Sequence, residues 1–297
     1  MKKILLLKTR SSDDALCHYL RSELGGEINL IVGAWQDIAF FVSQEKMTAW
    51  LNHQTLKTFD LIWLRKTKQE YHPLAKALAL YLEFKKINYF DRAWAKNKIG
   101  GDKLVNSVAL ALNGLPILPS FFCLGEKILT NKETIIHQFG FPLIVKNVQK
   151  HRGEGIFLLE NGEKFARFFR GVNKKTLFLF QKFYPNQGTH RLVVLGKKVV
   201  VWEKRVARVK DFRSAAIPDG QEEFFPVASL PREMAQISLK AAKILDLQVA
   251  GVDLLFDQQS KRYGLLEVNR SPGFTTDLQL SPELPAVAAF LKKAVTF

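Results

Sequence analysis

The chain carries two apolar stretches near its end, Val249-Ala-Gly-Val-Asp-Leu-Leu-Phe256 and Gly264-Leu-Leu-Glu-Val-Asn-Arg-Ser-Pro-Gly-Phe274. Each has the composition of a short buried strand. Asp253 and Glu267 lie inside these runs, where a carboxylate is costly unless it is paired or bound to a cation. Asn269 follows Glu267 at i+2, so both side chains point to one face of an extended strand. Two carboxylates and an amide oxygen suit Mg²⁺, and the alternative is an edge hairpin whose acids face water.

The length and composition indicate a globular protein with more than one packed unit. A chain of 297 residues with 47% hydrophobic residues is long for a single core. It contains no apolar run of membrane-spanning length. The apolar run that follows Met1 breaks at Lys8-Thr-Arg10, which favours a first strand over a signal peptide. Cys17 and Cys123 are far apart, which favours a reducing, cytoplasmic location.

The charge balance is strongly basic. A formal net charge of +16 predicts attraction to polyanions such as nucleic acid, ATP or an acidic peptide. The basic residues are scattered along the chain, and they form neither an arginine-rich tail nor an aromatic and basic nucleic-acid motif. A solvated basic surface without a partner is the alternative interpretation.

Strand and helix patterns alternate in the first third of the chain. Strands are expected at residues 3–7, 28–32 and 60–64, and helices at 13–24 and 72–86. This alternation predicts a parallel sheet, and ligands meet such sheets at the carboxyl ends of the strands. Arg65 and Lys66 follow one of these strands, so they are candidate anion contacts, with plain surface charges as the alternative.

A boundary is expected at residues 91–97, before a helix at 98–112. Lys146 then ends a buried strand, and the next segment contains Gly153 and Gly155 among basic residues. Successive backbone amides in a glycine loop can bind phosphate oxygens. This segment matches neither the Walker pattern nor Gly-x-Gly-x-x-Gly, so the loop alone is weak evidence for a nucleotide.

An ordered set of residues makes the pattern specific. It comprises Asp102-Lys103, Lys146, Gln181-Lys-Phe-Tyr184, Arg191, Arg205, Phe212-Arg213, Gly251-Val-Asp253 and Glu267-Val-Asn269-Arg-Ser-Pro-Gly-Phe274. In this order the chain resembles the ATP-grasp superfamily, and within it the RimK-type glutamate ligases. The resemblance covers residues 90–290, and the amino-terminal part is similar to the family's pre-grasp domain more loosely.

The resemblance implies a fold and a division into domains. It implies an ATP-grasp fold, in which two α+β lobes clamp ATP, preceded by a Rossmann-like α/β pre-grasp domain. The expected domains are the pre-grasp domain at 1–95, the amino-terminal ATP-grasp lobe at 96–180, and the carboxyl-terminal lobe with the metal site at 181–297.

The resemblance also implies roles for individual residues. By position, Asp253, Glu267 and Asn269 match the ligands of Mg²⁺, with Mn²⁺ as an alternative metal. The residues that match the nucleotide-binding set are Lys103, Lys146, Gly153, Gly155, Gln181, Lys182, Phe183 and Tyr184. The catalytic set, near the phosphates and the substrate carboxylate, is Arg191, Arg205 and Arg213.

Some positions depart from the family pattern. Lys182 and Thr189 stand where many relatives carry acids that contact the adenine amine or the ribose, which puts nucleotide choice in doubt. Ala215 replaces the usual asparagine, which alters the expected second metal or substrate carboxylate site. The basic Lys150-His-Arg152 segment is unusual and suits an acidic substrate.

The sequence therefore predicts a cytoplasmic, ATP-dependent carboxylate–amine ligase. The expected reaction proceeds through an acyl phosphate and adds glutamate or a similar amino acid to an acidic peptide or protein carboxylate. One alternative is a peptide-modifying ligase of the same superfamily that forms side-chain amide or ester bonds. Another is a non-catalytic protein that binds a nucleotide or RNA.

Overall fold

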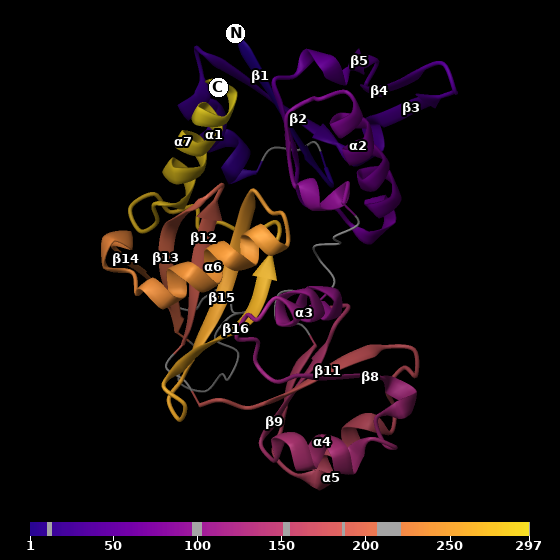
Figure 1. Cartoon of the computed structure of the whole chain (residues 1–297), viewed down its shortest axis with the longest axis vertical. Coiled ribbons are helices and arrows are strands. Elements are labelled where there is room, and N and C mark those ends of the chain that lie inside the picture. Colours follow the sequence, from indigo (N-terminus) through magenta and orange to yellow (C-terminus); the bar gives the residue numbers. More distant parts are fainter. Residues whose placement is uncertain (11–13, 97–102, 151–154, 186–187, 207–220, 297) are drawn as a thin grey trace.

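The computed structural model describes residues 1–10, 14–96, 103–150, 155–185, 188–206 and 221–296. Its elements form three groups along an elongated molecule (Figure 1). The amino-terminal sheet lies at one end, a five-stranded sheet lies in the middle, and a four-stranded sheet with two helices lies at the other end. Among the described residues, every helix is too short or too polar to cross a bilayer.

The amino-terminal group contains the parallel sheet that the alternating pattern predicts. Its strand order is β2 (Ile28–Ala34), β1 (Lys2–Lys8), β6 (Leu61–Leu64) and β7 (Tyr89–Phe90), and all neighbouring strands are parallel. Alternate residues of β1 face opposite sides, so Ile4 and Leu6 pack with helix α1 (Ala15–Leu24) while Leu5 and Leu7 pack with helix α2 (His72–Phe84). A small antiparallel sheet, which the sequence analysis did not predict, comprises β3 (Ile38–Val42), β4 (Met47–Leu51) and β5 (Gln54–Thr55).

The group at the far end is antiparallel and carries the glycine-loop region. Its order is β10 (Ile156–Leu159), β9 (Leu143–Asn147), β11 (Leu177–Lys182) and β8 (Phe121–Leu124). Helices α4 (Lys132–Phe139) and α5 (Gly162–Phe169) supply buried phenylalanines to a core shared with β11. Helix α3 (Lys103–Leu112) lies between this group and the middle sheet (Figure 1) and confirms the described part of the predicted helix.

The middle sheet holds the stretch quoted first. Its order is β14 (Gln221–Phe225), β13 (Lys198–Val206), β12 (Thr189–Leu195), β15 (Val249–Asp257) and β16 (Arg262–Asn269), and all pairs are antiparallel. Residues 221–223 are polar and locally resemble a loop, yet they begin strand β14. The strand forms there because its backbone pairs with β13, a partner that the local sequence does not reveal.

Two helices cover the middle sheet unequally. Even-numbered residues such as Leu192 and Val252 pack under helix α6 (Arg232–Ile244). On the opposite face, Val193 and Val249 pack with helix α7 (Glu283–Thr296), which also contacts α1. Odd-numbered positions further along that same face carry the polar residues of the candidate site. The sheets agree with the expected order of a parallel α/β sheet followed by two α+β units, and the bounds of the three expected domains stay predictions.

The carboxyl end of β6 is bound to the loop that follows Asn269. Arg65 is only 2% exposed, and its Nη2 donates to the carbonyl oxygen of Pro272 at 2.7 Å. Its guanidinium lies 5.1 Å from the ring centre of Trp63 and 4.8 Å from that of Phe274. The backbone N–H of Lys66 donates to Ser271 Oγ at 3.2 Å. The sequence analysis gave Arg65 as a candidate anion contact, but here it joins the amino-terminal sheet to the loop that follows Asn269.

We expect Arg65→Ala to lower the free energy of unfolding by about 3 kcal/mol, because the buried guanidinium, its hydrogen bond and its stacking are lost together. Urea denaturation measures this, with Lys68→Ala as the control, since Lys68 is exposed three residues further along the chain. Equal effects of the two substitutions would contradict the structural role of Arg65.

Candidate active site

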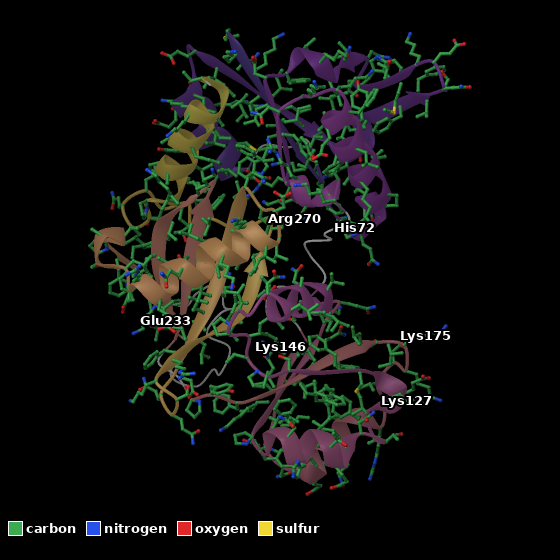
Figure 2. The ribbon with its side chains drawn as sticks, viewed as in Figure 1. His72, Lys127, Lys146, Lys175, Glu233 and Arg270 are labelled. Carbon is green, nitrogen blue, oxygen red and sulfur yellow. The ribbon has the colours of Figure 1, made fainter. Side chains whose placement is uncertain are left out.

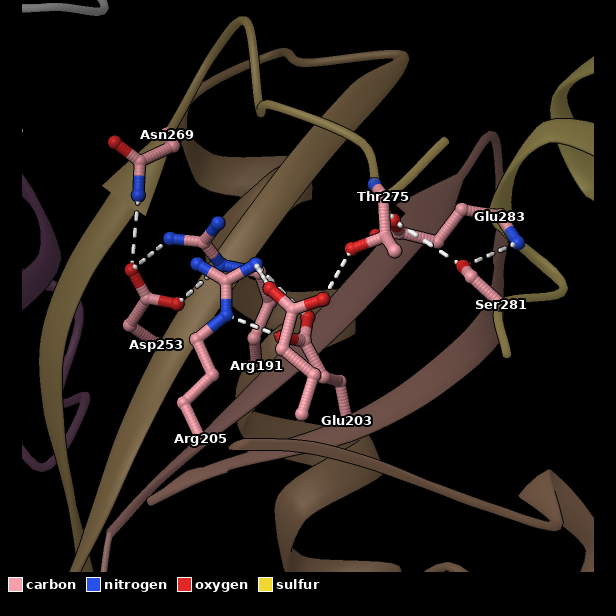
Figure 3. Close-up of polar contacts among 9 residues, drawn as sticks. Arg191, Glu203, Arg205, Asp253, Asn269, Thr275, Ser281 and Glu283 are labelled. Atoms are coloured by element: carbon pink, nitrogen blue, oxygen red, sulfur yellow. Dashed lines mark hydrogen bonds and ion pairs between the residues drawn. The ribbon is translucent and has the colours of Figure 1, made fainter. Parts of the chain in front are cut away.

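Strands β15 and β16 bring the three predicted metal ligands to one place. Asp253 pairs in register with Glu267, and Gly251 pairs with Asn269, so the three side chains share a face. Asp253 is 3% exposed, whereas Glu267 and Asn269 are half-buried. The amide nitrogen of Asn269 donates to Asp253 Oδ2 at 2.9 Å (Figure 3). The geometry therefore supports the proximity on which the metal prediction depends.

Arg191 on β12 forms a buried ion pair with Asp253. Its Nε and Nη2 donate to the two carboxylate oxygens at 2.7 and 2.9 Å (Figure 3). Burial alone would lower the pKa of Arg191, but the adjacent Asp253 carboxylate raises it above its usual value. With Asn269, Asp253 accepts three hydrogen bonds, and a carboxylate has about four lone-pair positions. The carboxylate therefore keeps some capacity for a cation.

The donor set fits a hard divalent cation. Among the described residues, no three His, Cys, Asp or Glu side chains are placed to hold a metal ion. The predicted set has two carboxylates and one amide, a combination that suits Mg²⁺ because this ion keeps several waters and takes phosphate oxygens as further ligands.

Lys146 brings positive charge to these carboxylates from the other lobe. It lies on β9, where the far-end group meets the middle sheet (Figure 2). Loss of surrounding water lowers the pKa of Lys146 to about 8; the nearby charge of Lys103 acts in the same direction, whereas Glu267 and Asp253 oppose the shift. Two predicted phosphate-binding lysines and two predicted metal ligands are thus close enough to influence one another electrostatically.

The segment expected to meet adenine connects the two lobes. Gln181, the residue before the last of β11, is buried at 4% exposed, and its Nε2 donates to Ser120 Oγ at 2.8 Å. Lys182 Nζ lies 3.3 Å from Gln259 Oε1 and 5.8 Å from the ring centre of Tyr184. Phe183 donates its backbone N–H to the carbonyl oxygen of Pro142 at 3.3 Å. Their contact with a nucleotide stays a prediction.

Only part of the predicted glycine and arginine loops is described. Gly155 adopts φ +76°, which favours glycine, and its carbonyl accepts from the backbone N–H of Asn147 at 2.8 Å. Gly153 and Arg213 lie outside the described residues, as do His151, Arg152 and Ala215.

The structure adds acidic residues that the sequence analysis did not single out. Glu203 on β13 pairs in register with Arg191 and is 0% exposed, and its carboxylate binds the guanidinium of Arg205. Arg205 Nη2 also lies 3.3 Å from Glu222 Oε1. Arg205 was predicted to bind phosphate or carboxylate, and here it binds two carboxylates of the protein. An acid at the end of the apolar run Val199–Trp202 was the available signal for Glu203, the same signal that identified Asp253.

The two predicted metal carboxylates should differ in their effect on stability. Asp253→Asn removes the partner of a buried guanidinium and should lower the free energy of unfolding by about 3 kcal/mol. Glu267→Gln, at a half-buried position, should change it by less than about 1 kcal/mol. Urea denaturation without metal measures both, and a greater loss in Glu267→Gln would contradict the ion-pair assignment.

Comparison with known proteins bears on this geometry. A family model described as the RimK-like ATP-grasp domain matches residues 101–281. A probable alpha-L-glutamate ligase of Coxiella burnetii is 42% identical over 140 residues, which cover 45% of this chain and 44% of that protein. A protein of the same description from Alkalilimnicola ehrlichii is 32% identical over 177 residues, which cover 58% and 56%. The chain thus spans about half the length of these curated relatives.

Solved structures match the fold over nearly the whole chain. The ATP-grasp ligase PsnB complexed with minimal precursor has a TM-score of 0.71 at 17% identity, covering 98% of this chain and 99% of that one. The macrocyclase MdnC bound with precursor peptide MdnA, from Microcystis aeruginosa, has a TM-score of 0.70 at 14% identity, covering 99% and 100%. The D-alanine-D-alanine ligase from Coxiella burnetii has a TM-score of 0.66 at 13% identity, covering 100% and 94%. Because the family model spans more than half of the chain and the fold agrees, the chain belongs to the RimK-like ATP-grasp family.

Proposed function

We propose that the protein is an ATP- and Mg²⁺-dependent carboxylate–amine ligase that releases ADP. The observation that carries this proposal is that Asp253 and Glu267 of one lobe lie close enough to Lys146 of the other for their charges to act on its pKa. Phosphoryl transfer depends mainly on positioning and on charge neutralisation, and this arrangement offers both signs of charge at one place.

The roles of the residues follow from their positions. Asp253, Glu267 and Asn269 would hold Mg²⁺, or Mn²⁺ in its place, and the metal would neutralise phosphate charge. Lys103 and Lys146 would bind phosphate oxygens, and Arg191 would hold the Asp253 carboxylate in its orientation. The segment from Gln181 to Tyr184 would meet adenine, and the loop that contains Gly155 would approach the phosphates.

The proposed substrates are an amino acid and a peptide or protein carboxylate. Support for glutamate as the added amino acid comes from the relatives described as probable alpha-L-glutamate ligases. The net charge of +16 favours an acidic acceptor. A second candidate is a ligase that forms side-chain amide or ester bonds within a peptide, because the peptide-bound PsnB and MdnC structures match nearly the whole chain.

The two free cysteines, far apart in sequence, support a cytoplasmic location.

The function is tested by a screen of amino acids, with acidic and neutral peptides, for ADP release and for mass-shifted products. We expect product only with ATP and Mg²⁺, and a loss of at least about 100-fold in Glu267→Gln, because transition-state charge then lacks its counter-ion. Glu45→Gln, at an exposed site in the amino-terminal group, is the control and should keep full activity. Unchanged turnover in Glu267→Gln would contradict the metal assignment. In a separate measurement, raised salt should lower the turnover of acidic peptides and leave that of neutral peptides unchanged.

The lowered pKa of Lys146 gives a pH prediction for nucleotide binding. Its ammonium is charged below its pKa of about 8, so affinity for a non-hydrolysable ATP analogue should fall as the pH rises through this value. Lys146→Arg, whose guanidinium stays protonated, should remove the fall. Isothermal titration measures both affinities, and the same pH dependence in the two proteins would show that Lys146 does not contact the phosphates.

A further inference from the structure

A second polar cluster lies beside the predicted metal site. It comprises Glu203, Arg205, Glu222, Thr275, Ser281 and Glu283, and Figure 3 shows it adjoining Arg191 and Asp253. Strands β13 and β14 supply the first three residues, and the loop after β16 and the start of α7 supply the others. This set, here called the acidic cluster, is not part of the machinery proposed above except for Arg205.

The described part of the acidic cluster carries more negative than positive charge. Its three carboxylates face one guanidinium, that of Arg205, which contacts Glu203 and Glu222. Glu203 and Glu283 are each 0% exposed. Burial raises the pKa of Glu203 to about 7 although Arg205 opposes the shift, and burial also raises the pKa of Glu283. The positive charge of Arg205 and of the nearby Arg191 therefore does not offset the cost of burying the Glu203 and Glu283 carboxylates.

One oxygen in the acidic cluster has no hydrogen-bond partner in the part of the chain that the structure describes. Glu283 Oε2 accepts from the backbone N–H of Thr275 and from Ser281 Oγ, the latter at 3.4 Å, whereas Oε1 is buried and unpaired. The Glu283 carboxyl lies near enough to Arg205, Arg191 and Glu222 for their charges to act on it. A buried carboxylate oxygen without a donor is costly, so this position favours a ligand that donates hydrogen bonds.

The chemistry of the acidic cluster favours an ammonium group over a metal ion. Among the described residues no three acidic, His or Cys side chains converge as a metal site requires, whereas an ammonium can donate a hydrogen bond to the single unpaired oxygen, Glu283 Oε1. The location is suitable, because Glu203 is the register partner of Arg191, and Arg191 pairs with Asp253. A ligand held there lies one strand away from the predicted metal site.

We infer that Glu283 accepts a hydrogen bond from the α-ammonium group of the amino acid that the ligase joins to its carboxylate substrate, while Glu203 and Glu222 add negative charge around it. The inference rests on the proposed function and specifies its second substrate as an amino acid recognised by its charged amine. Thr275 then fixes the orientation of two of these acids, because its hydroxyl donates to Glu222 and its backbone N–H donates to Glu283.

The test is a binding measurement that does not need turnover. Each of the common L-amino acids is compared with its 2-hydroxy acid analogue by isothermal titration in the presence of Mg²⁺ and ADP. The analogue keeps the carboxylate and side chain but replaces the ammonium by a neutral hydroxyl. At least one amino acid should bind at least about tenfold more tightly than its analogue, a difference typical of a charged hydrogen bond.

Substitutions test whether the preference for the amino acid over its 2-hydroxy acid analogue depends on the acidic cluster. Glu203→Gln and Glu283→Gln should each abolish the preference for the amino acid, whereas Glu223→Gln should keep it, because Glu223 is exposed and neighbours Glu222 on the same strand. Thermal denaturation shows whether each variant is folded. If no amino acid is preferred, or if the preference survives in both folded variants, the inference is overturned.

A separate reaction distinguishes failure of this inference from failure of the proposed function. Hydroxylamine is largely uncharged at neutral pH, so it can trap an acyl phosphate without an ammonium subsite. With ATP, Mg²⁺ and a short peptide ending in glutamates, the wild type and Glu283→Gln should both form hydroxamate, while the KM for the amino acid rises at least about tenfold in the variant. No hydroxamate from the wild type would contradict the ligase proposal, whereas the binding comparison would still decide the subsite.

The sequence of the β13–β14 connection contains Arg208, Lys210 and Arg213, which lie outside the described residues. If these cations, rather than a substrate, neutralise the cluster, Glu203→Gln would lower stability and leave the amino-acid preference unchanged. That outcome also overturns the inference.

Discussion

The buried ion pair between Arg191 and Asp253 is the constraint on which the candidate site depends. Both side chains are almost fully buried, so each charge needs the other, and the pairing of β12 with β15 holds them opposite one another. The same pairing places Glu203 on one side of Arg191 and Glu267 on the other side of Asp253. A single row across four strands thus carries Glu203, Arg191, Asp253 and Glu267, in which one base lies between two acids and a third acid follows.

Short-range sequence patterns revealed the part of this row that lies on one hairpin. Asp253 stands out as an acid in an apolar run, and the i+2 spacing of Glu267 and Asn269 predicts their common face. Glu203 carries a similar signal, but Lys204 and Arg205 follow it, and the run reads locally as the exposed end of a strand. Glu283 reads as an acid in the first turn of a helix, a common surface position. Glu203 becomes a neighbour of the site only through the register of β13 with β12, and Glu283 only because α7 packs against the middle sheet.

The fold was predictable to a similar degree. The parallel amino-terminal sheet follows from alternating periods of apolar residues, and the ordered motifs identified the ATP-grasp family. The strands β3, β4 and β5 were missed because β3 and β4 have five residues each, β5 has two, and none has a distinct turn signature. The role of Arg65 was missed for another reason: a basic residue at the carboxyl end of a strand suits an anion, and nothing local predicts that a carbonyl 207 residues away will use it.

The position of helix α7 has a consequence for the order in which the protein folds. Leu284, Val287, Leu291 and Val295 belong to the same core as Leu16 and Leu20 of α1 and Ile4 and Leu6 of β1. The core on this face of β1 therefore combines the adjacent helix α1 with a helix that lies more than 270 residues further along the chain. Contacts so distant in sequence require closure of a long loop, so we expect the docking of α7 to be a late step in folding.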